Sequence, residues 1–420
     1  MSRLKSLMIA LEGDEVVPEE VQPGVPAEVE ASAADMVEDS RDVDELATAI
    51  EEAGDDVDDL EKIQDVVSDS IESGKGVEPV TAEMADIAVE AIRERLGIKG
   101  RRFAPSLEAF NDKNTKLATS KVALEGVKDT LKKAFETIRK AISAMFERII
   151  AFFQKHRQVN NSLRVAIMNS NRHRTDLKGK TAEETELKDE RKLAIDLGNV
   201  PEALVREHVR VTTELFRLNG QASSIAERLI AGCEPGGETA SDRGAALHDE
   251  MAVAFDGIMH KDMNCKQAKG MNKCFNVGGL FQGQSIFSTV EGKEGTDDFK
   301  IRVFRDQLHE ESEVTKVLKV LSIDEQDDFL MSLMKVVDIN EKLVNEQAPI
   351  SKCKSSVEKA LDKALTRYGD DAAADIKDLR DVSQFFMSMM AQLNLSISVM
   401  NVGLVKSGLQ YVAACQKQFK

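Results

Sequence analysis

The distribution of charged and aromatic residues along the chain is the feature that most restricts its fold. Residues 1–108 carry 10 basic and 29 acidic side chains, a net charge of −19. Residues 109–420 carry 46 basic and 45 acidic side chains, a net charge of +1. All 19 aromatic residues lie at or beyond Phe103. A segment without aromatic side chains buries little apolar surface, so we expect the core to lie in the body that follows it.

The acidic segment is expected to form an arm in front of this body. Residues 13–40 combine Pro, Gly, Ala and Glu and are predicted to be disordered. Apolar residues recur at helical spacing between Asp42 and Ile71, which predicts a weak helix. A second helix, capped by Thr81, is predicted to bury the stripe Met84, Ile87, Ala88, Ala91 and Leu96. The arm is therefore predicted to be largely disordered, with weak helices.

The body is predicted to be mainly helical with one inserted β-hairpin. Apolar residues at intervals of three and four predict an amphipathic helix from Phe135 to Phe152, and Pro201 opens another. Two β-branched and aromatic runs, separated by polar turn residues, predict a hairpin over about residues 284–304. Residues 382–405 carry no charge, but their Ser, Asn and Gln residues favour a helix buried among other helices over a membrane span.

Four segments follow from these patterns in a chain of the mainly α class. Residues 1–12 form a leader that resembles a targeting segment, and residues 13–108 form the acidic arm. Residues 109–232 and 245–420 form two helical subdomains, the second of which contains the hairpin. The apolar run from Leu7 to Leu11 is too short for a secretory signal, and 5 dispersed cysteines do not make a disulfide framework. We therefore expect a reducing, intracellular origin.

The sequence carries no motif of a familiar catalytic site. It lacks the G-x-S-x-G elbow, the G-x-G-x-x-G nucleotide-binding pattern and the H-E-x-x-H zinc motif. His260, Cys265 and Cys274 come nearest to a metal site, but their spacing supplies no close pair of zinc ligands. We therefore predict no catalytic residue, no cofactor and no metal. An enzyme with an unfamiliar helical active site stays open as an alternative, which a pocket with convergent ionisable groups would support.

Basic side chains cluster at a few places in the body. Lys155, Arg157, Arg172 and Arg174 could contact phosphate groups, because lysine and arginine neutralise a nucleic-acid backbone without reading its sequence. The net charge of +1 on residues 109–420 favours an ordinary solvated face instead. Non-specific contact with DNA stays open beside that interpretation.

A short motif coincides with the break in composition. Ser106-Leu107-Glu108 has a small residue, an aliphatic residue and then glutamate, and Ala10-Leu11-Glu12 repeats the pattern near the start of the chain. Pro105, directly before the first motif, favours an extended, cleavable strand at Ser106-Leu107-Glu108. Ala123-Leu124-Glu125 has the same pattern but lies on a predicted helix, so we expect a protease to spare it.

With this layout the sequence resembles the internal head proteins, or inner body proteins, of giant phiKZ-like tailed phages. In that family a prohead protease cuts after glutamate in a small-x-Glu context and removes an acidic N-terminal propeptide during capsid maturation. The resemblance implies a virion structural protein made as a precursor and cut between Glu108 and Ala109, with a secondary site between Glu12 and Gly13. Loss of residues 1–108 would change each copy from a net charge of −18 to about +1.

The resemblance also implies partners and a location. The partners would be the prohead protease, capsid or scaffold proteins, other internal head proteins and, without sequence specificity, packaged DNA; no membrane is implied. The protein would lie in the capsid interior, after assembly in the host cytoplasm, and its ejection with the DNA stays open. The alternative is a cytoplasmic helical regulatory protein whose acidic arm is a permanent autoinhibitory or DNA-mimicking tail.

Overall fold

The structure is a computed structural model, and it describes residues 27–99, 103, 106–112, 114–174, 177–186, 201–232, 271–277, 284–292, 299–307, 317–345, 347–367, 379–380, 382–384, 386–387 and 390–419. The mainly α class is confirmed in these residues, because helices make up most of them. The leader at 1–12, with its secondary cleavage site, lies outside the described residues, as do His260 and Cys265.

Two helices occupy the acidic arm, α2 (Ala27–Glu72) and α3 (Pro79–Leu96). The expectation of a largely disordered arm is therefore wrong from residue 27 onward. Apart from Ala49, which is buried beside the others, the buried apolar residues of α2 are Met36, Val43, Leu46, Ile50, Ala53, Val57, Leu60 and Val67. These positions all fit one seven-residue repeat, which places them along a single seam of the helix. A narrow seam of aliphatic residues thus orders the arm without any aromatic side chain.

The orientation of α3 also differs from the expected stripe. The helix begins at Pro79, with Glu78 at the cap position instead of Thr81, because proline is well suited to the first helical turn. Gly97 ends it with a left-handed φ of 62°, which favours glycine. The buried apolar residues are Ala82, Ala85, Val89, Ile92 and Leu96. Met84 and Ile87 point outward, so only Leu96 of the large predicted stripe residues is buried.

The helices of the body follow the short 3-10 turn η1 (Glu108–Phe110). They are α4 (Lys116–Lys155), α5 (Val159–Arg174), α6 (Pro201–Gly232), α8 (Ile323–Asn345), α9 (Ala348–Arg367) and α11 (Ile397–Gln416). The predicted helices at 135–152 and from Pro201 are confirmed within α4 and α6. A turn of π-helix, η4 (Ala391–Ser396), leads directly into α11. All six of its residues are buried, which agrees with the expectation of a buried helix over residues 382–405.

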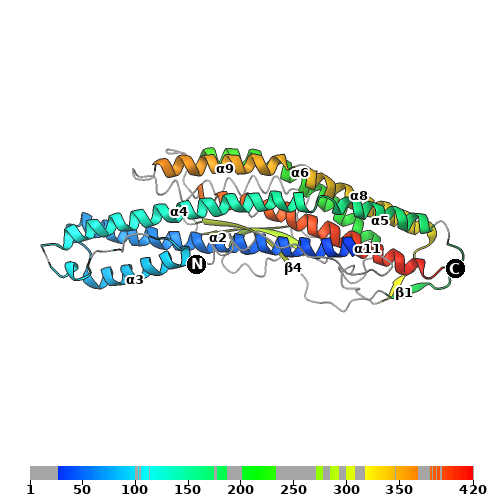
Figure 1. The fold of residues 1–420 in the computed structure, drawn as a ribbon, viewed down its shortest axis with the longest axis horizontal. Coiled ribbons are helices and arrows are strands. Elements are labelled where there is room, and N and C mark those ends of the chain that lie inside the picture. The colour runs from blue at the N-terminus through cyan, green and yellow to red at the C-terminus, as the bar shows by residue number, and fades with distance from the viewer. Residues whose placement is uncertain are drawn as a thin grey trace. The chain divides into compact units, whose positions relative to one another are not determined.

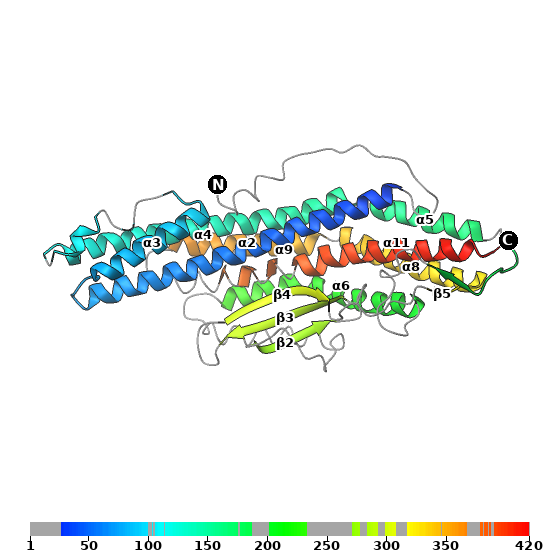
Figure 2. The same cartoon turned by 90° about the horizontal axis from the view of Figure 1, so that it is seen from below.

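Two small antiparallel sheets complete the described elements. The predicted hairpin is confirmed as β3 (Gln284–Gly292) and β4 (Phe299–Gln307), which pair with Phe287 opposite Phe304. A third strand that the sequence did not predict, β2 (Met271–Val277), pairs with the other side of β3, as Figure 2 shows. The second sheet joins β1 (Glu184–Glu186) to β5 (Val317–Lys319).

The chain divides into two compact units. Unit 1 comprises Met1–Glu15, Asp44–Met145 and Val357–Gln384, and unit 2 comprises Val16–Val43, Phe146–Ser356 and Phe385–Lys420. Both units therefore contain residues from the arm and residues from the body. These units group the chain differently from the four sequence segments, whose boundaries stay a prediction about processing.

Helices α5, α6, α8 and α11 form the helical core of unit 2. Helix α8 contacts the other three, and α5, α8 and α11 run side by side in Figure 1. Helices α8 and α11 approach closely at Gly408, where an added Cβ atom would lie 2.7 Å from both Cδ atoms of Leu333. A side chain at this position would therefore force the buried Leu333 to shift, although the backbone of Gly408 is ordinary helix.

Candidate functional site

The candidate processing segment Ser106–Glu108 is exposed between α3 and α4. The side chains of Ser106, Leu107 and Glu108 all face solvent, and Ala109 is partly exposed. On either side, the buried rings of Phe103 and Phe110 stack with their centroids 6.4 Å apart. The aromatic pair thus closes a short accessible loop around the predicted cleavage site.

The backbone of this segment is turned, which corrects the extended conformation expected from Pro105. Leu107 has helical torsion angles, φ −68° and ψ −29°. The Phe110 N–H donates to the Leu107 carbonyl at 3.2 Å, and the Asn111 N–H donates to the Glu108 carbonyl at 3.0 Å. A proline restricts the residue before it and not those after it, so Pro105 does not control this turn. The bond after Glu108 therefore lies within a single 3-10 turn.

In unit 1, polar contacts join the arm to residues beyond the candidate site. The Val77 N–H donates to Ser120 Oγ at 2.9 Å, and Lys116 Nζ lies 2.5 Å from Glu78 Oε1. Gly76, with a left-handed φ of 67°, precedes these contacts, and a Cβ atom there would lie 3.1 Å from Ser120 Oγ. The start of α3 is thereby fixed to the start of α4.

A buried arginine makes a second connection between arm and body in unit 1. Arg380 is 2% exposed, and its Nη2 lies 2.7 Å from Asp58 Oδ1 on α2. Its Nη1 donates to the Gly54 carbonyl at 3.1 Å, and Gln384 Nε2 donates to the Ile50 carbonyl at 3.1 Å. A charge that is out of water is tolerated only when it is paired, so Arg380 depends on α2.

The four predicted phosphate-binding residues all lie in unit 2. Lys155 Nζ lies 3.0 Å from Asp39 Oδ2, and Arg174 lies 3.0 Å from Asp327 Oδ1 and donates to the Ile323 carbonyl. These two cations have carboxylate partners within the chain. Lys155, Arg157 and Arg172 are all exposed. The structure does not gather the four into one site.

The carboxylate of Asp39 also contacts His156, which is 4% exposed. His156 Nε2 lies 2.6 Å from Asp39 Oδ2. Partial burial raises the pKa of Asp39, but hydrogen bonds with His156 and Lys155 outweigh it and hold the pKa below its ordinary value. This carboxylate therefore anchors the start of α2 to the end of α4 within unit 2.

A chain of four buried polar side chains connects four helices of unit 2. Asn340 on α8 donates from Nδ2 to Asn160 Oδ1 on α5 at 2.8 Å. Asn401 on α11 donates to Asn340 Oδ1 at 3.3 Å, and its own Oδ1 lies 2.8 Å from His208 Nε2 on α6. None of the four is more than 2% exposed. Burial lowers the pKa of His208 to about 4, although the Asn401 contact raises it, so the imidazole is neutral at pH 7.

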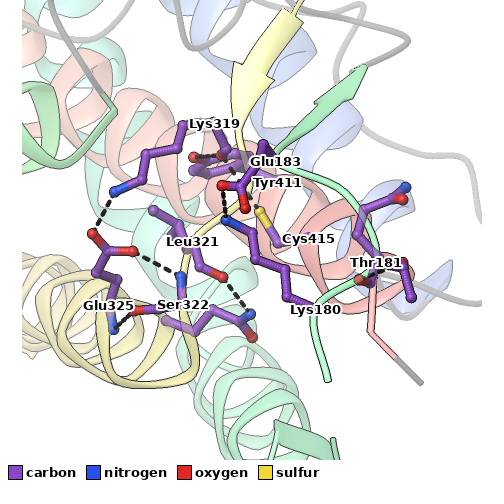
Figure 3. A network of polar contacts seen from close by, with 11 residues as sticks. Lys180, Thr181, Glu183, Lys319, Leu321, Ser322, Glu325, Tyr411 and Cys415 are labelled. Carbon is purple, nitrogen blue, oxygen red and sulfur yellow. Dashed lines mark hydrogen bonds and ion pairs between the residues drawn. The ribbon is translucent and has the colours of Figure 1, made fainter. Parts of the chain in front are cut away.

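A second polar network lies where β5 meets α8 and α11 (Figure 3). Ser322 Oγ accepts from the Glu325 N–H at 3.2 Å while Glu325 Oε2 accepts from the Ser322 N–H at 2.7 Å, a capping box that begins α8. Tyr411 donates its hydroxyl to the Lys319 carbonyl at 2.6 Å, and Lys319 Nζ lies 2.6 Å from Glu325 Oε1. These contacts hold β5 against the start of α8 and against α11.

The same network brings together two side chains of types that can act as nucleophiles, Tyr411 and Cys415. Burial raises the pKa of the Tyr411 hydroxyl well above its ordinary value and raises the pKa of the Cys415 thiol to about 11. Both groups are therefore protonated at pH 7, whereas a nucleophile needs a lowered pKa. The arrangement favours a structural role for the pair.

The described residues lack the features of two other functional classes, metal-binding proteins and membrane-spanning proteins. No group of three or more His, Cys, Asp or Glu side chains in the described ranges has the proximity needed to hold a metal ion. Within the same ranges, no helix combines the length and the apolar character needed to cross a bilayer.

The polar chain and the capping box were not predicted from the sequence. Asn401 is one of the polar residues that disfavour a membrane span over residues 382–405, but nothing in the sequence indicates that Asn160, Asn340 and His208 meet it. Ser322 and Glu325 do show the S-x-x-E spacing of a capping box, so this start of a helix could have been found.

Comparisons with known proteins identify the family. The sequence profile of phiKZ-like phage internal head proteins matches residues 31–418. Searches of curated proteins and of solved structures gave no match. The profile covers most of the arm as well as the body. The chain therefore belongs to the phiKZ-like phage internal head proteins.

Proposed function

We propose that this internal head protein is made as a precursor and is cut between Glu108 and Ala109 by the prohead protease during head maturation. As a member of its family, the protein is a structural component of the virion, located inside the phage head. The observation that carries the proposal is the exposed segment Ser106–Glu108, which lies at the change in net charge from −19 to +1.

The surroundings of the other small-x-Glu motifs support the choice of Glu108. Ala123 of Ala123-Leu124-Glu125 is fully buried within α4, and Ile50 of Ala49-Ile50-Glu51 is fully buried within α2. A protease binds its substrate in an extended conformation, and a single exposed turn opens at a lower free-energy cost than the interior of a packed helix. The segment Ser106–Glu108 therefore opens most easily among these motifs.

Cleavage at Glu108 would not by itself release the arm. The buried seam of α2, the Arg380–Asp58 ion pair and the Val77–Ser120 hydrogen bond all remain after the bond is cut. We therefore expect a nicked protein whose two fragments stay associated. A change in the charge of each copy from −18 to about +1 needs a further step that removes residues 1–108.

N-terminal sequencing and denaturing intact-mass measurement of the protein from purified particles test the proposal. We expect a new N-terminus at Ala109, which Glu108→Ala abolishes because the exposed glutamate is the recognition residue. Glu125→Ala is the matched control, since it alters the same motif within α4 and should leave processing unchanged. An intact chain in mature particles, or normal processing of Glu108→Ala, would contradict the proposal.

Size-exclusion chromatography of the same material under native conditions, with the mass of each peak measured, tests whether the two fragments stay associated. We expect residues 1–108 and the body to elute as one complex and to separate only in denaturant. A body that elutes alone under native conditions would show that release accompanies cleavage, without affecting the assignment of Ala109 as the new N-terminus.

We further propose that contact with packaged DNA is non-specific and involves Arg157 and Arg172. Both side chains are exposed at the surface of unit 2. Arg157→Ala/Arg172→Ala should reduce the salt slope of DNA binding by about one per lost phosphate contact. Lys121→Ala/Lys132→Ala removes two exposed charges of α4 as a control. Equal effects of the two double variants would remove these arginines from the proposal.

A further inference from the structure

Helix α3 exposes an apolar stripe on the face opposite to its buried residues. Val80, Met84 and Ile87 are 69%, 68% and 65% exposed. They recur at intervals of four and three residues, so they lie along one side of the helix. Ala91 continues the same line and is partly exposed. Single exposed apolar residues are ordinary, but an aligned row on an ordered helix is typical of a binding surface.

The helix that carries this stripe is held firmly at both ends within unit 1. Its start is fixed by the Val77–Ser120 hydrogen bond and the Glu78–Lys116 ion pair. Near its end, the guanidinium of Arg95 on α3 contacts both carboxylate oxygens of Asp56, with distances of 2.5 to 3.1 Å. The stripe is therefore ordered before a partner arrives, which lowers the entropy cost of binding.

Acidic side chains run along one flank of the stripe. Glu83, Glu90 and Glu94 are exposed and recur at intervals of seven and four residues, so they form a row beside Met84 and Ile87. Glu90 is paired with Arg93 of the same helix at 2.6 Å, which leaves the row acidic at both of its ends. The surface thus combines an apolar stripe with a negatively charged edge.

We propose that this surface, defined by Val80, Met84, Ile87, Glu83 and Glu94, docks a protein partner that presents an apolar groove with lysine or arginine along one rim. The charge of the edge selects the class of partner. DNA and anionic lipid would be repelled by the glutamates and by the net charge of −19 on residues 1–108. A second copy of the chain would bring an equally acidic arm against the first, which like-charge repulsion opposes. A protein within the assembling head whose apolar groove has a basic rim would cover the apolar stripe and pair with the glutamates along its edge.

The docking surface does not depend on cleavage at Glu108. The precursor carries it, and a nicked protein whose fragments stay associated would carry it as well. Failure of the cleavage proposal would therefore leave this inference intact, and the reverse also holds.

Site-specific photocrosslinking in proheads tests the surface. A tagged full-length chain with Met84→p-benzoylphenylalanine is produced during infection, proheads are irradiated, and the crosslinked peptides are identified by mass spectrometry. The control places the same group at Val122, which is 50% exposed on α4 in the same unit. We expect position 84 to crosslink to a head protein, next to lysine or arginine residues, with at least about fivefold the yield of position 122.

Charge reversal tests the acidic edge separately. Glu83→Lys/Glu94→Lys should lower the crosslink yield at position 84 about tenfold, because the partner's basic rim would be repelled. Glu125→Lys changes an exposed glutamate of α4 and should leave the yield unchanged. Crosslinks to a second copy, to residues 1–26 of the same chain or to DNA would overturn the proposal. So would the absence of a crosslink above the control, or a yield that ignores the charge reversal.

Discussion

The buried polar chain of unit 2 offers the sharpest test of what holds the body together. Asn401 is its central member, because it contacts Asn340 on α8 and His208 on α6. Its side chain is 1% exposed, so water does not reach these contacts in the folded protein. We predict that Asn401→Ala strongly destabilises unit 2, although alanine favours a helix.

The magnitude follows from the two contacts that the substitution removes. The Oδ1 of Asn340 and the Nε2 of His208 each lose a partner at 3.3 Å and 2.8 Å. A buried polar group that loses its partner costs about 1–3 kcal/mol. The truncated amide also leaves a small cavity, while alanine recovers a few tenths of a kcal/mol in helix propensity. We therefore expect a loss of about 3–5 kcal/mol in the free energy of unfolding of unit 2.

Hydrogen–deuterium exchange measured by mass spectrometry is the appropriate assay, because a chain with two units need not unfold in one step. Exchange of α8 and α11 peptides should accelerate about 10²- to 10³-fold, since each 1.4 kcal/mol corresponds to a factor of ten. Peptides from α3, in unit 1, should change little.

Ser398→Ala is the matched control on the same helix. Ser398 is fully buried, one turn before Asn401, and its hydroxyl has no hydrogen-bond partner in the described part of the chain. Removing an unsatisfied hydroxyl should be neutral or should stabilise by up to about 1 kcal/mol. If Ser398→Ala were as damaging as Asn401→Ala, burial alone would explain the loss, and the polar chain would have no special role.

Two further predictions concern packing and pH. Gly408→Ala should destabilise the α8–α11 contact by about 1–3 kcal/mol, because its Cβ would lie 2.7 Å from the buried Leu333, whereas Gly220→Ala on α6 meets nothing within 4 Å and should stabilise by about 0.5–1 kcal/mol. Thermal unfolding of the two variants should shift in opposite directions, and shifts of one sign would contradict the packing argument. Since the pKa of His208 is lowered from 6.5 to about 4, the unfolded chain binds the proton more readily, so stability should fall by up to about 3 kcal/mol as the pH drops from 6.5 to 4. His208→Gln should lose this part of the pH dependence in exchange measurements, and an unchanged profile would exclude the histidine as its source.

The helical class and the hairpin were predictable because each depends on local periodicity. The amphipathic spacing of α4 and the β-branched residues of β3 and β4 are visible without tertiary contacts. The third strand, β2, was missed because Met271–Val277 contains three polar residues and little β-branched character. Pairing with β3 stabilises these residues as a strand, which their own sequence does not indicate.

The stripe of α3 shows where periodicity is ambiguous. Two faces of this helix carry apolar residues, and the larger side chains, Met84 and Ile87, favoured the wrong one. The face that packs has small residues such as Ala82 and Ala85, which permit close approach of neighbouring elements. Side-chain size therefore does not identify the buried face when a helix has an apolar residue on each side. The polar chain was unpredictable for a related reason, since its members come from four separate helices.

The acidic arm and the near-neutral body are not electrostatically separate, because carboxylates of the arm pair with side chains of the body. Apart from Asp39, which occupies a seam position, the acidic residues of α2 lie outside the heptad seam. The aliphatic residues of the seam can therefore pack while the carboxylates stay in water or meet polar partners. Three of those partners, Lys155, His156 and Arg380, belong to the body. Removal of the arm would take away their carboxylate partners and would uncover the surfaces that the seam covers. DNA could replace the carboxylates as an anion, but it could not cover apolar side chains. Any step that releases residues 1–108 therefore requires a rearrangement of the body or a second protein surface in their place.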